Sequence, residues 1–370
     1  MLKSNREIKH PGSAAQALGI TAGLVLLLLS VSGLFAQFDA SGPSSNTTDK
    51  TRFAFIPIPN YNEATGFGLG LMATLFYPLS KDDKASPASS TTLFGFYSSN
   101  QTWVGGAAQK MHLKEDTYRL TLALATASIN YQFYDEWITG GFIDYNASSA
   151  FAFAKGSRRI LPKFYLGLKY RYTRSRTTFD IPVDYEPPTE TYSGLGPILS
   201  YDSRNSVFAP SAGFFVEFES LIHHTSLGSE KTYSLFELKA NHYLKIKGNQ
   251  VLALRIATKV GTGDVPFNDQ ALMVGTDLRG YSSGKYRGDQ KYTAQAEYRW
   301  AFHKKLGLVA FAGFGYVTDS LSRIRIQDTL PSLGIGVRYL AIPSMGITVG
   351  IDAAAGKEET ALYFRILEAF

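Results

Sequence analysis

The sequence predicts an all-β protein that crosses a membrane as a single antiparallel β-barrel. Apolar and polar residues alternate along most of the chain from residue 52 onward, as in the segment LKYRYT at 168–173. This alternation is typical of strands with one apolar and one polar face. Beyond residue 36, no apolar run reaches the roughly 18–20 residues that a membrane helix requires. Aromatic residues are plentiful, with 22 Tyr and 25 Phe, and they recur at strand ends, where membrane barrels carry their aromatic girdles.

About sixteen segments alternate in this way, and membrane barrels have an even number of strands. The segments begin near residues 52, 66, 90, 102, 117, 141, 163, 191, 212, 231, 250, 291, 306, 332, 345 and 359. Each strand with its connection then takes about 20 residues, which fits one closed barrel over residues 52–370. Two alternatives stay open: fourteen strands, because 141–156 is weakly patterned, and a soluble β-sandwich.

The N-terminal segment is expected to serve export rather than the fold. A basic start precedes an uncharged run from Ala14 to Ala36, which predicts a secretory signal peptide over residues 1–36. A retained N-terminal membrane anchor is the alternative. Residues 37–51 are polar and are expected to form a disordered linker. Signal peptide and barrel together predict a protein of the bacterial outer membrane, in contact with its lipids.

Composition argues against several kinds of site. The chain has no cysteine, which excludes disulfides and thiolate metal sites. His223 and His224 are neighbours near a strand end, so their side chains point to opposite faces and cannot chelate one metal. We therefore expect no metal and no cofactor. The net charge of +6 is mild for 370 residues and does not indicate nucleic-acid binding.

One connection stands out by its length. About 29 residues separate the strands expected at 251–261 and 291–301, and unstructured connections of that length are usually functional or disordered. This one contains DLRGYSSGKYRGD at 277–289. Apolar residues precede that stretch, so the connection is not merely polar filler. We expect an extracellular loop that folds back into the barrel lumen.

The loop and its surroundings resemble the BamA/TamA superfamily of outer-membrane barrels, also called bacterial surface antigens. LRGY at 278–281 is similar to the family's loop motif, and AEYRW at 296–300 to the strand that follows it. The segment YDSRNSVFAPSAGFFVEFES at 201–220 is similar to the family's strand-turn-strand with its D-x-R and P-x-x-G elements. The resemblance covers residues 52–370 and implies a loop that tucks into the lumen.

The same resemblance assigns residues to the loop and its wall. The lumen loop motif is formed by Leu278, Arg279, Gly280 and Tyr281, and the loop arginine reaches acidic residues on the inner wall. Glu297 matches the wall glutamate, and it shares a strand face with Arg299. Gly313 stands where the family has a second wall aspartate, and Asp352 is the candidate replacement. Arg287, in the same loop, is the competing arginine.

The resemblance implies assistance in the assembly, insertion or translocation of outer-membrane or surface proteins, without enzymatic activity. The partners would be unfolded outer-membrane clients or accessory envelope proteins. The chain is similar to the branch without POTRA domains. A weak lateral seam between the first and last strands is expected at Pro57, Pro59, Phe364 and Phe370, since proline lacks a backbone donor. A passive structural or channel barrel with a loop plug is the alternative function. A barrel hydrolase is disfavoured because no Ser–His pair stands out.

Overall fold

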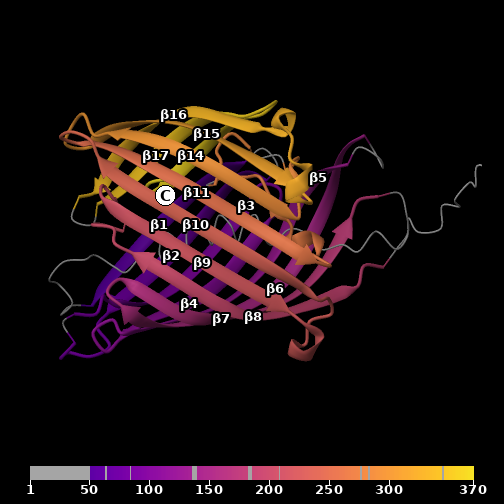
Figure 1. Ribbon diagram of the computed structural model, residues 1–370, viewed down its shortest axis with the longest axis horizontal. Helices are drawn as coiled ribbons and strands as arrows, with labels where there is room; N and C mark the ends of the chain where they lie inside the picture. The colour runs from indigo at the N-terminus through magenta and orange to yellow at the C-terminus, as the bar shows by residue number, and fades with distance from the viewer. Residues whose placement is uncertain are drawn as a thin grey trace, which may run out of the picture.

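The wall of the molecule is one antiparallel sheet of sixteen strands, curled until its first and last strands approach each other (Figure 1). The computed structural model describes residues 51–62, 65–83, 85–135, 140–181, 186–207, 209–275, 277–281, 284–343 and 346–370. Strands adjacent in the wall are consecutive in the sequence, except that β11 pairs with β14 across the long connection. The single sixteen-stranded barrel predicted from the alternation is confirmed.

The strands begin within two residues of their expected starts. The first eight are β1 (Arg52–Asn62), β2 (Gly66–Tyr77), β3 (Ser89–Ser98), β4 (Trp103–Leu113), β5 (Tyr118–Asp135), β6 (Gly141–Leu161), β7 (Phe164–Phe179) and β8 (Thr189–Asp202). The second eight are β9 (Gly213–His223), β10 (Tyr233–Lys245), β11 (Gln250–Gly263), β14 (Gln290–Trp300), β15 (Leu306–Thr318), β16 (Leu330–Ile342), β17 (Ile347–Ala355) and β18 (Thr360–Ile366). The weakly patterned segment at 141–156 lies within β6, the longest strand, which excludes the fourteen-strand alternative.

The two faces of the wall have opposite chemistry. Large apolar side chains lie exposed on the outer face, among them Leu124, Leu168 and Ile335. Polar and charged side chains are buried on the other face, where Lys155 Nζ lies 2.7 Å from Glu217 Oε2. This distribution is the reverse of a water-soluble protein and suits a barrel whose outer face meets hydrocarbon.

The antiparallel order places alternate connections at opposite ends of the barrel. We call the end where β18 finishes the turn rim, and the other end the loop rim. The turn rim contains the connections 78–88, 114–117, 162–163, 203–212, 246–249, 301–305 and 343–346. The loop rim contains the 26-residue connection 264–289, the longest between described strands.

The hydrogen-bonded order begins at β1 and ends at β18, and the part of the chain that the structure describes shows no ladder between these two strands. Pro57, Pro59 and Phe364 have exposed side chains on these strands. The two edges approach each other without pairing.

The last four residues correct one expectation about this seam. Leu367 has a left-handed backbone, with φ at 70°, so β18 stops at Ile366. The tail then turns away from β1, and Phe370 packs against Tyr243 and Ala253 on the polar face of β10 and β11. Phe370 was expected at the lateral seam, and this expectation is wrong. Strand β18 ends at Ile366, four residues before Phe370, and the Phe370 side chain packs on the polar face instead.

Residues 1–50 lie outside the described residues. The signal peptide expected over 1–36 falls entirely in that segment, as does nearly all of the linker expected over 37–51. None of the helices in the described ranges is long and apolar enough to span a membrane.

Candidate functional site

The long connection 264–289 packs against the polar face of the wall at several points. Its described residues include the 3-10 helix η2 (Phe267–Asp269) and two short strands, β12 (Ala271–Leu272) and β13 (Arg287–Gly288), that pair with each other. Leu278, Arg279 and Tyr281 are fully buried. We refer to this connection as the long loop.

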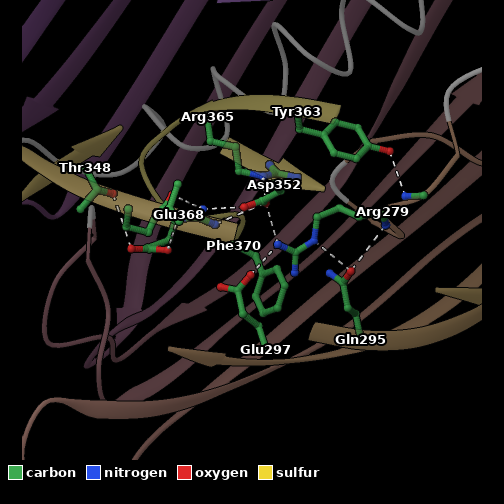
Figure 2. Close-up of polar contacts among 12 residues, drawn as sticks. Arg279, Gln295, Glu297, Thr348, Asp352, Tyr363, Arg365, Glu368 and Phe370 are labelled. Atoms are coloured by element: carbon green, nitrogen blue, oxygen red, sulfur yellow. Dashed lines mark hydrogen bonds and ion pairs between the residues drawn. The ribbon is translucent and has the colours of Figure 1, made fainter. Parts of the chain in front are cut away.

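Arg279 is the principal contact between the long loop and the wall. Its Nη1 atom lies 2.6 Å from Glu297 Oε2 and 2.9 Å from Asp352 Oδ2. Its Nε donates to Gln295 Oε1 at 3.2 Å, and the guanidinium lies 3.3 Å from the centre of the Phe311 ring. Figure 2 shows the side chain between Asp352 on one side and Gln295 and Glu297 on the other. The side chains of Arg279, Glu297 and Asp352 have no exposed surface. Because water cannot solvate these charges, each must be neutralised by its charged neighbours.

Asp352 joins this contact to the last strands of the wall. It accepts from Arg338 Nη1 on β16 and from Arg365 Nε on β18, each at 2.5 Å. Glu297 also binds Arg299 Nε at 2.6 Å, and Glu368 of the tail accepts from Arg338 Nε at 3.1 Å. We call these residues the arginine cluster: Arg279, Arg299, Arg338, Arg365, Glu297, Asp352 and Glu368. It links the long loop to four wall strands and the tail.

Gly313 explains why the acidic partner comes from another strand. A Cβ atom there would lie 2.6 Å from the Ala294 carbonyl oxygen and 2.9 Å from Leu278 Cδ1. The loop leucine and the neighbouring strand occupy the space that an aspartate needs. Asp352, two wall strands away on β17, supplies the second carboxylate instead.

Gly280 and Tyr281 seat the loop behind the arginine. Gly280 has φ at 105°, and a Cβ there would lie 2.8–2.9 Å from backbone atoms of Ala355 and Gly356; only glycine tolerates both conditions. The Tyr281 hydroxyl donates to the Pro331 carbonyl oxygen at 2.6 Å and accepts from the Lys357 N–H at 2.9 Å. The motif residues expected from the sequence thus share one tightly packed site.

A second anchor, which the sequence did not indicate, lies on the wall strands β5 to β7. Phe267 packs among Phe133, Tyr145 and Phe179, with ring centres 5.1–5.9 Å apart. Arg287 stacks on Phe267 at 3.9 Å and donates to its carbonyl oxygen at 2.7 Å. Arg287, the alternative candidate for the wall-binding arginine, therefore contacts another part of the loop itself and stabilises the position of Phe267. The long loop contacts widely separated parts of the wall.

A third contact of the loop is electrostatic. Asp277, which directly precedes the LRGY motif, binds Arg255 Nη2 and Lys291 Nζ, each at 2.7 Å. Burial would raise the pKa of this carboxyl, but the two cations outweigh burial and hold the pKa well below its ordinary value of 3.8. Asp277 is therefore ionised, and it fixes the backbone just before Arg279.

Asp269 of η2 gives a pH-dependent prediction. It accepts from the Tyr233 hydroxyl at 2.5 Å and pairs with Arg171. Burial raises its pKa, but the charges of Arg171 and Lys259 outweigh burial and lower the pKa from 3.8 to about 2. A lowered folded-state pKa means that this anchor is complete above about pH 4 and is lost as pH falls toward 2. We expect pepsin cleavage within the long loop to rise over that interval.

The control for this prediction is Asp269→Asn, which removes the titrating group but keeps its shape. Cleavage in the variant should already be raised at pH 4 and should change less with further acidification than in the unaltered protein. Equal pH profiles for the two proteins would contradict the assignment to Asp269.

Comparison with known proteins agrees with this architecture. Residues 89–366 match the family model described as the Omp85 superfamily domain. A search of curated proteins found no match. Among solved structures, BamA from Haemophilus ducreyi lacking POTRA domains 1–3 is similar, with a TM-score of 0.63 and 13% identity over 92% of this chain and 78% of that one.

Two structures of CdiB are also similar. CdiB from Acinetobacter baumannii has a TM-score of 0.56 and 13% identity, and CdiB from Escherichia coli has 0.60 and 11%. The matches cover 85% of this chain in both cases, but only 59% and 62% of the respective CdiB chains. At these identities the likeness concerns the fold.

Proposed function

Because this chain belongs to the Omp85 superfamily, we propose that it is an outer-membrane barrel that assists the insertion or translocation of other proteins through a lateral seam between β1 and β18. Membership in this family is consistent with a location in the outer membrane. The clients in this proposal are unfolded outer-membrane or surface proteins, and no catalytic chemistry is involved.

The observation that carries the proposal is the unpaired edge at the seam. The described residues show no ladder between β1 and β18, although both strands pair fully on their other sides. The two edge strands also differ in length, eleven residues in β1 against seven in β18. Pro57 and Pro59 of β1 have no backbone N–H to donate. An unpaired strand edge is a template to which an extended segment can add by backbone hydrogen bonds.

The long loop supports a plugged resting state of the same barrel. Its contacts with β5 to β7 through Phe267 and with the arginine cluster through Arg279 lie on different parts of the polar face. We infer that the loop occupies the lumen and blocks passage through it. The same observation favours the second candidate function, a passive barrel whose permeability the loop sets.

Crosslinking the seam distinguishes the two functions. The chain contains no cysteine, so an introduced pair is the only one present. We propose cysteines at Ala54, Ile56 or Ile58 of β1, each combined with one at Ala361 of β18, and selection of the pair that oxidises. Oxidation should abolish the outer-membrane insertion of clients in cells that depend on the protein, and reductant should restore it.

The matched control joins Ala54 to Thr74, which are register partners in the intact β1–β2 ladder. That bond fixes β1 equally but leaves the seam free, so client levels should stay normal. If the seam bond is as harmless as the control bond, lateral insertion is excluded and the passive barrel stands.

A further inference from the structure

Apolar side chains and lysines occur together on the turn rim. Two neighbouring connections show this most clearly: 246–249 after β10 and 301–305 after β14. Strands β11 and β14 are paired, with Gln250 opposite Trp300, and the Ala301 N–H donates to the Asn249 carbonyl oxygen at 3.1 Å. The two turns therefore form one continuous surface.

This surface carries four lysines and no acidic residue. Lys245 precedes the first turn, Lys247 lies within it, Lys304 and Lys305 lie in the second, and all four are exposed. The segments 244–251 and 300–308 contain neither Asp nor Glu. Within the described ranges, none of the four lysines forms an ion pair. Among the described residues, one cation–π contact involves these lysines: Lys305 Nζ lies 6.0 Å from the centre of the Tyr339 ring.

The lysines border the apolar outer face directly. Ile246 and Phe302 are exposed at the tips of the two turns, and Trp300, Leu306 and Leu308 are exposed on the wall beside them. A lysine at such a border extends its charged end into the headgroup layer while its carbon chain remains among apolar groups. This is the position at which a basic residue meets lipid phosphate.

The loop rim differs in charge. There the basic residues share their connections with acidic ones: Arg323 and Arg325 lie between Asp319 and Asp328, and Lys357 precedes Glu358 and Glu359. Arg323 lies within 3.7 Å of Asp319, and Lys285 within 2.6 Å of Glu358. The same mixture occurs in other turn-rim connections, where Lys81 is followed by Asp82 and Asp83, and Lys114 by Glu115 and Asp116. The turns 246–249 and 301–305 carry lysines without such acidic neighbours, and they lie at the rim that in membrane barrels is the periplasmic side.

We propose that the surface formed by Lys245, Lys247, Lys304 and Lys305 binds the phosphate groups of anionic phospholipids in the leaflet at the turn rim. The exposed apolar residues beside it contact the acyl chains of the same lipids. Anionic phospholipids would therefore be enriched in the lipid layer around this part of the barrel, next to strands β10, β11, β14 and β15. This inference requires only that the barrel spans a membrane and does not depend on insertion activity.

Two tryptophans make a matched pair of reporters. Trp300 lies beside the lysine turns and is 44% exposed, whereas Trp103 begins β4 at the loop rim and is 40% exposed. Two single-tryptophan proteins, W103F/W137F and W137F/W300F, would be placed in phosphatidylcholine bilayers. Each bilayer contains the same minor fraction of brominated phosphatidylglycerol or brominated phosphatidylcholine. The ratio of the two quenching efficiencies gives the local enrichment of the anionic lipid.

We expect an enrichment of about threefold or more at Trp300, and none at Trp103. Replacing the four lysines by glutamine should reduce the ratio at Trp300 to about one, whereas R323Q/R325Q at the loop rim should not change it. Raising the salt from about 0.05 M to about 1 M shortens the screening length to about 3 Å and should also abolish the enrichment. This salt titration needs no lysine variant, so it holds even if the quadruple variant folds poorly.

Equal quenching by the two lipids at Trp300 would overturn the proposal. So would an enrichment that survives both the lysine substitutions and high salt, because the lysines would then not be its cause. An enrichment of the same size at Trp103 would show a general preference of the barrel and would also overturn the assignment to these turns.

Discussion

Arg279→Ala is expected to release the LRGY segment from the wall while the barrel stays folded. The substitution removes a fully buried cation from between Glu297 and Asp352. Each carboxylate keeps another arginine, Arg299 for Glu297 and Arg338 for Asp352. We therefore expect a local cost of about 1–3 kcal/mol, the range for leaving a buried group short of a partner. The wall ladders do not involve Arg279 and should be unaffected.

Trypsin measures this release, because Lys285 lies four residues after the motif and becomes more cleavable when the segment detaches. Arg279→Lys is the informative companion, since it keeps the charge but loses the planar fork and the stacking on Phe311; cleavage should be intermediate. Arg323→Ala is the control, because that arginine is 73% exposed in another loop. Unchanged cleavage in Arg279→Ala would contradict the role given to this residue.

The barrel could be predicted from sequence because its physics is local. In a wall one strand thick, each residue faces either lipid or the polar face, and the choice alternates with every step along the strand. Phe67, Leu69 and Leu71 are all exposed to the outside, and Gly68 and Gly70 lie between them, as the pattern at 66–71 indicates. Such a pattern locates strands without any knowledge of their neighbours.

The arginine cluster could be predicted only in part. Arg279 and Glu297 are singled out by the family motif. Asp352 is indicated only indirectly, because Gly313 stands where the family has its second wall aspartate and another carboxylate must replace it. Arg338 and Arg365 belong to different strands, far from Arg279 in the sequence, and nothing local marks them. Their contacts depend on how the curled sheet brings β16 and β18 to the long loop, which is a tertiary property.

The second anchor and the tail were missed for related reasons. Phe267 stands in the sequence as one more aromatic residue, and its packing partners are more than 80 positions away, at 133, 145 and 179. Phe370 has the apolar alternation of a strand residue. The strand nevertheless stops because Leu367 adopts a left-handed backbone, which is unusual for leucine and cannot be inferred from its type.

Asp352→Asn is expected to have the largest effect of any single substitution in the arginine cluster. The aspartate accepts from Arg279, Arg338 and Arg365 in a site without solvent exposure. The amide keeps the shape but leaves three guanidinium groups around a neutral residue. Breaking a buried charge network in this way costs about 3–5 kcal/mol. Urea unfolding of the barrel in detergent micelles should therefore shift to clearly lower urea concentration.

A second substitution tests whether the loss is electrostatic. Arg365→Gln removes one of the three cations, so it should be harmful alone but should restore part of the stability in the Asp352→Asn background. The double-mutant cycle should give a coupling energy well above the roughly 0.3–0.5 kcal/mol expected of independent sites. Asp202→Asn is the matched control, because its carboxylate pairs with Arg204 at the turn rim and is 19% exposed, so its loss should be much smaller. Additive losses for Asp352→Asn and Arg365→Gln would mean that the two side chains act separately, and the shared network described for the last strands would have to be abandoned.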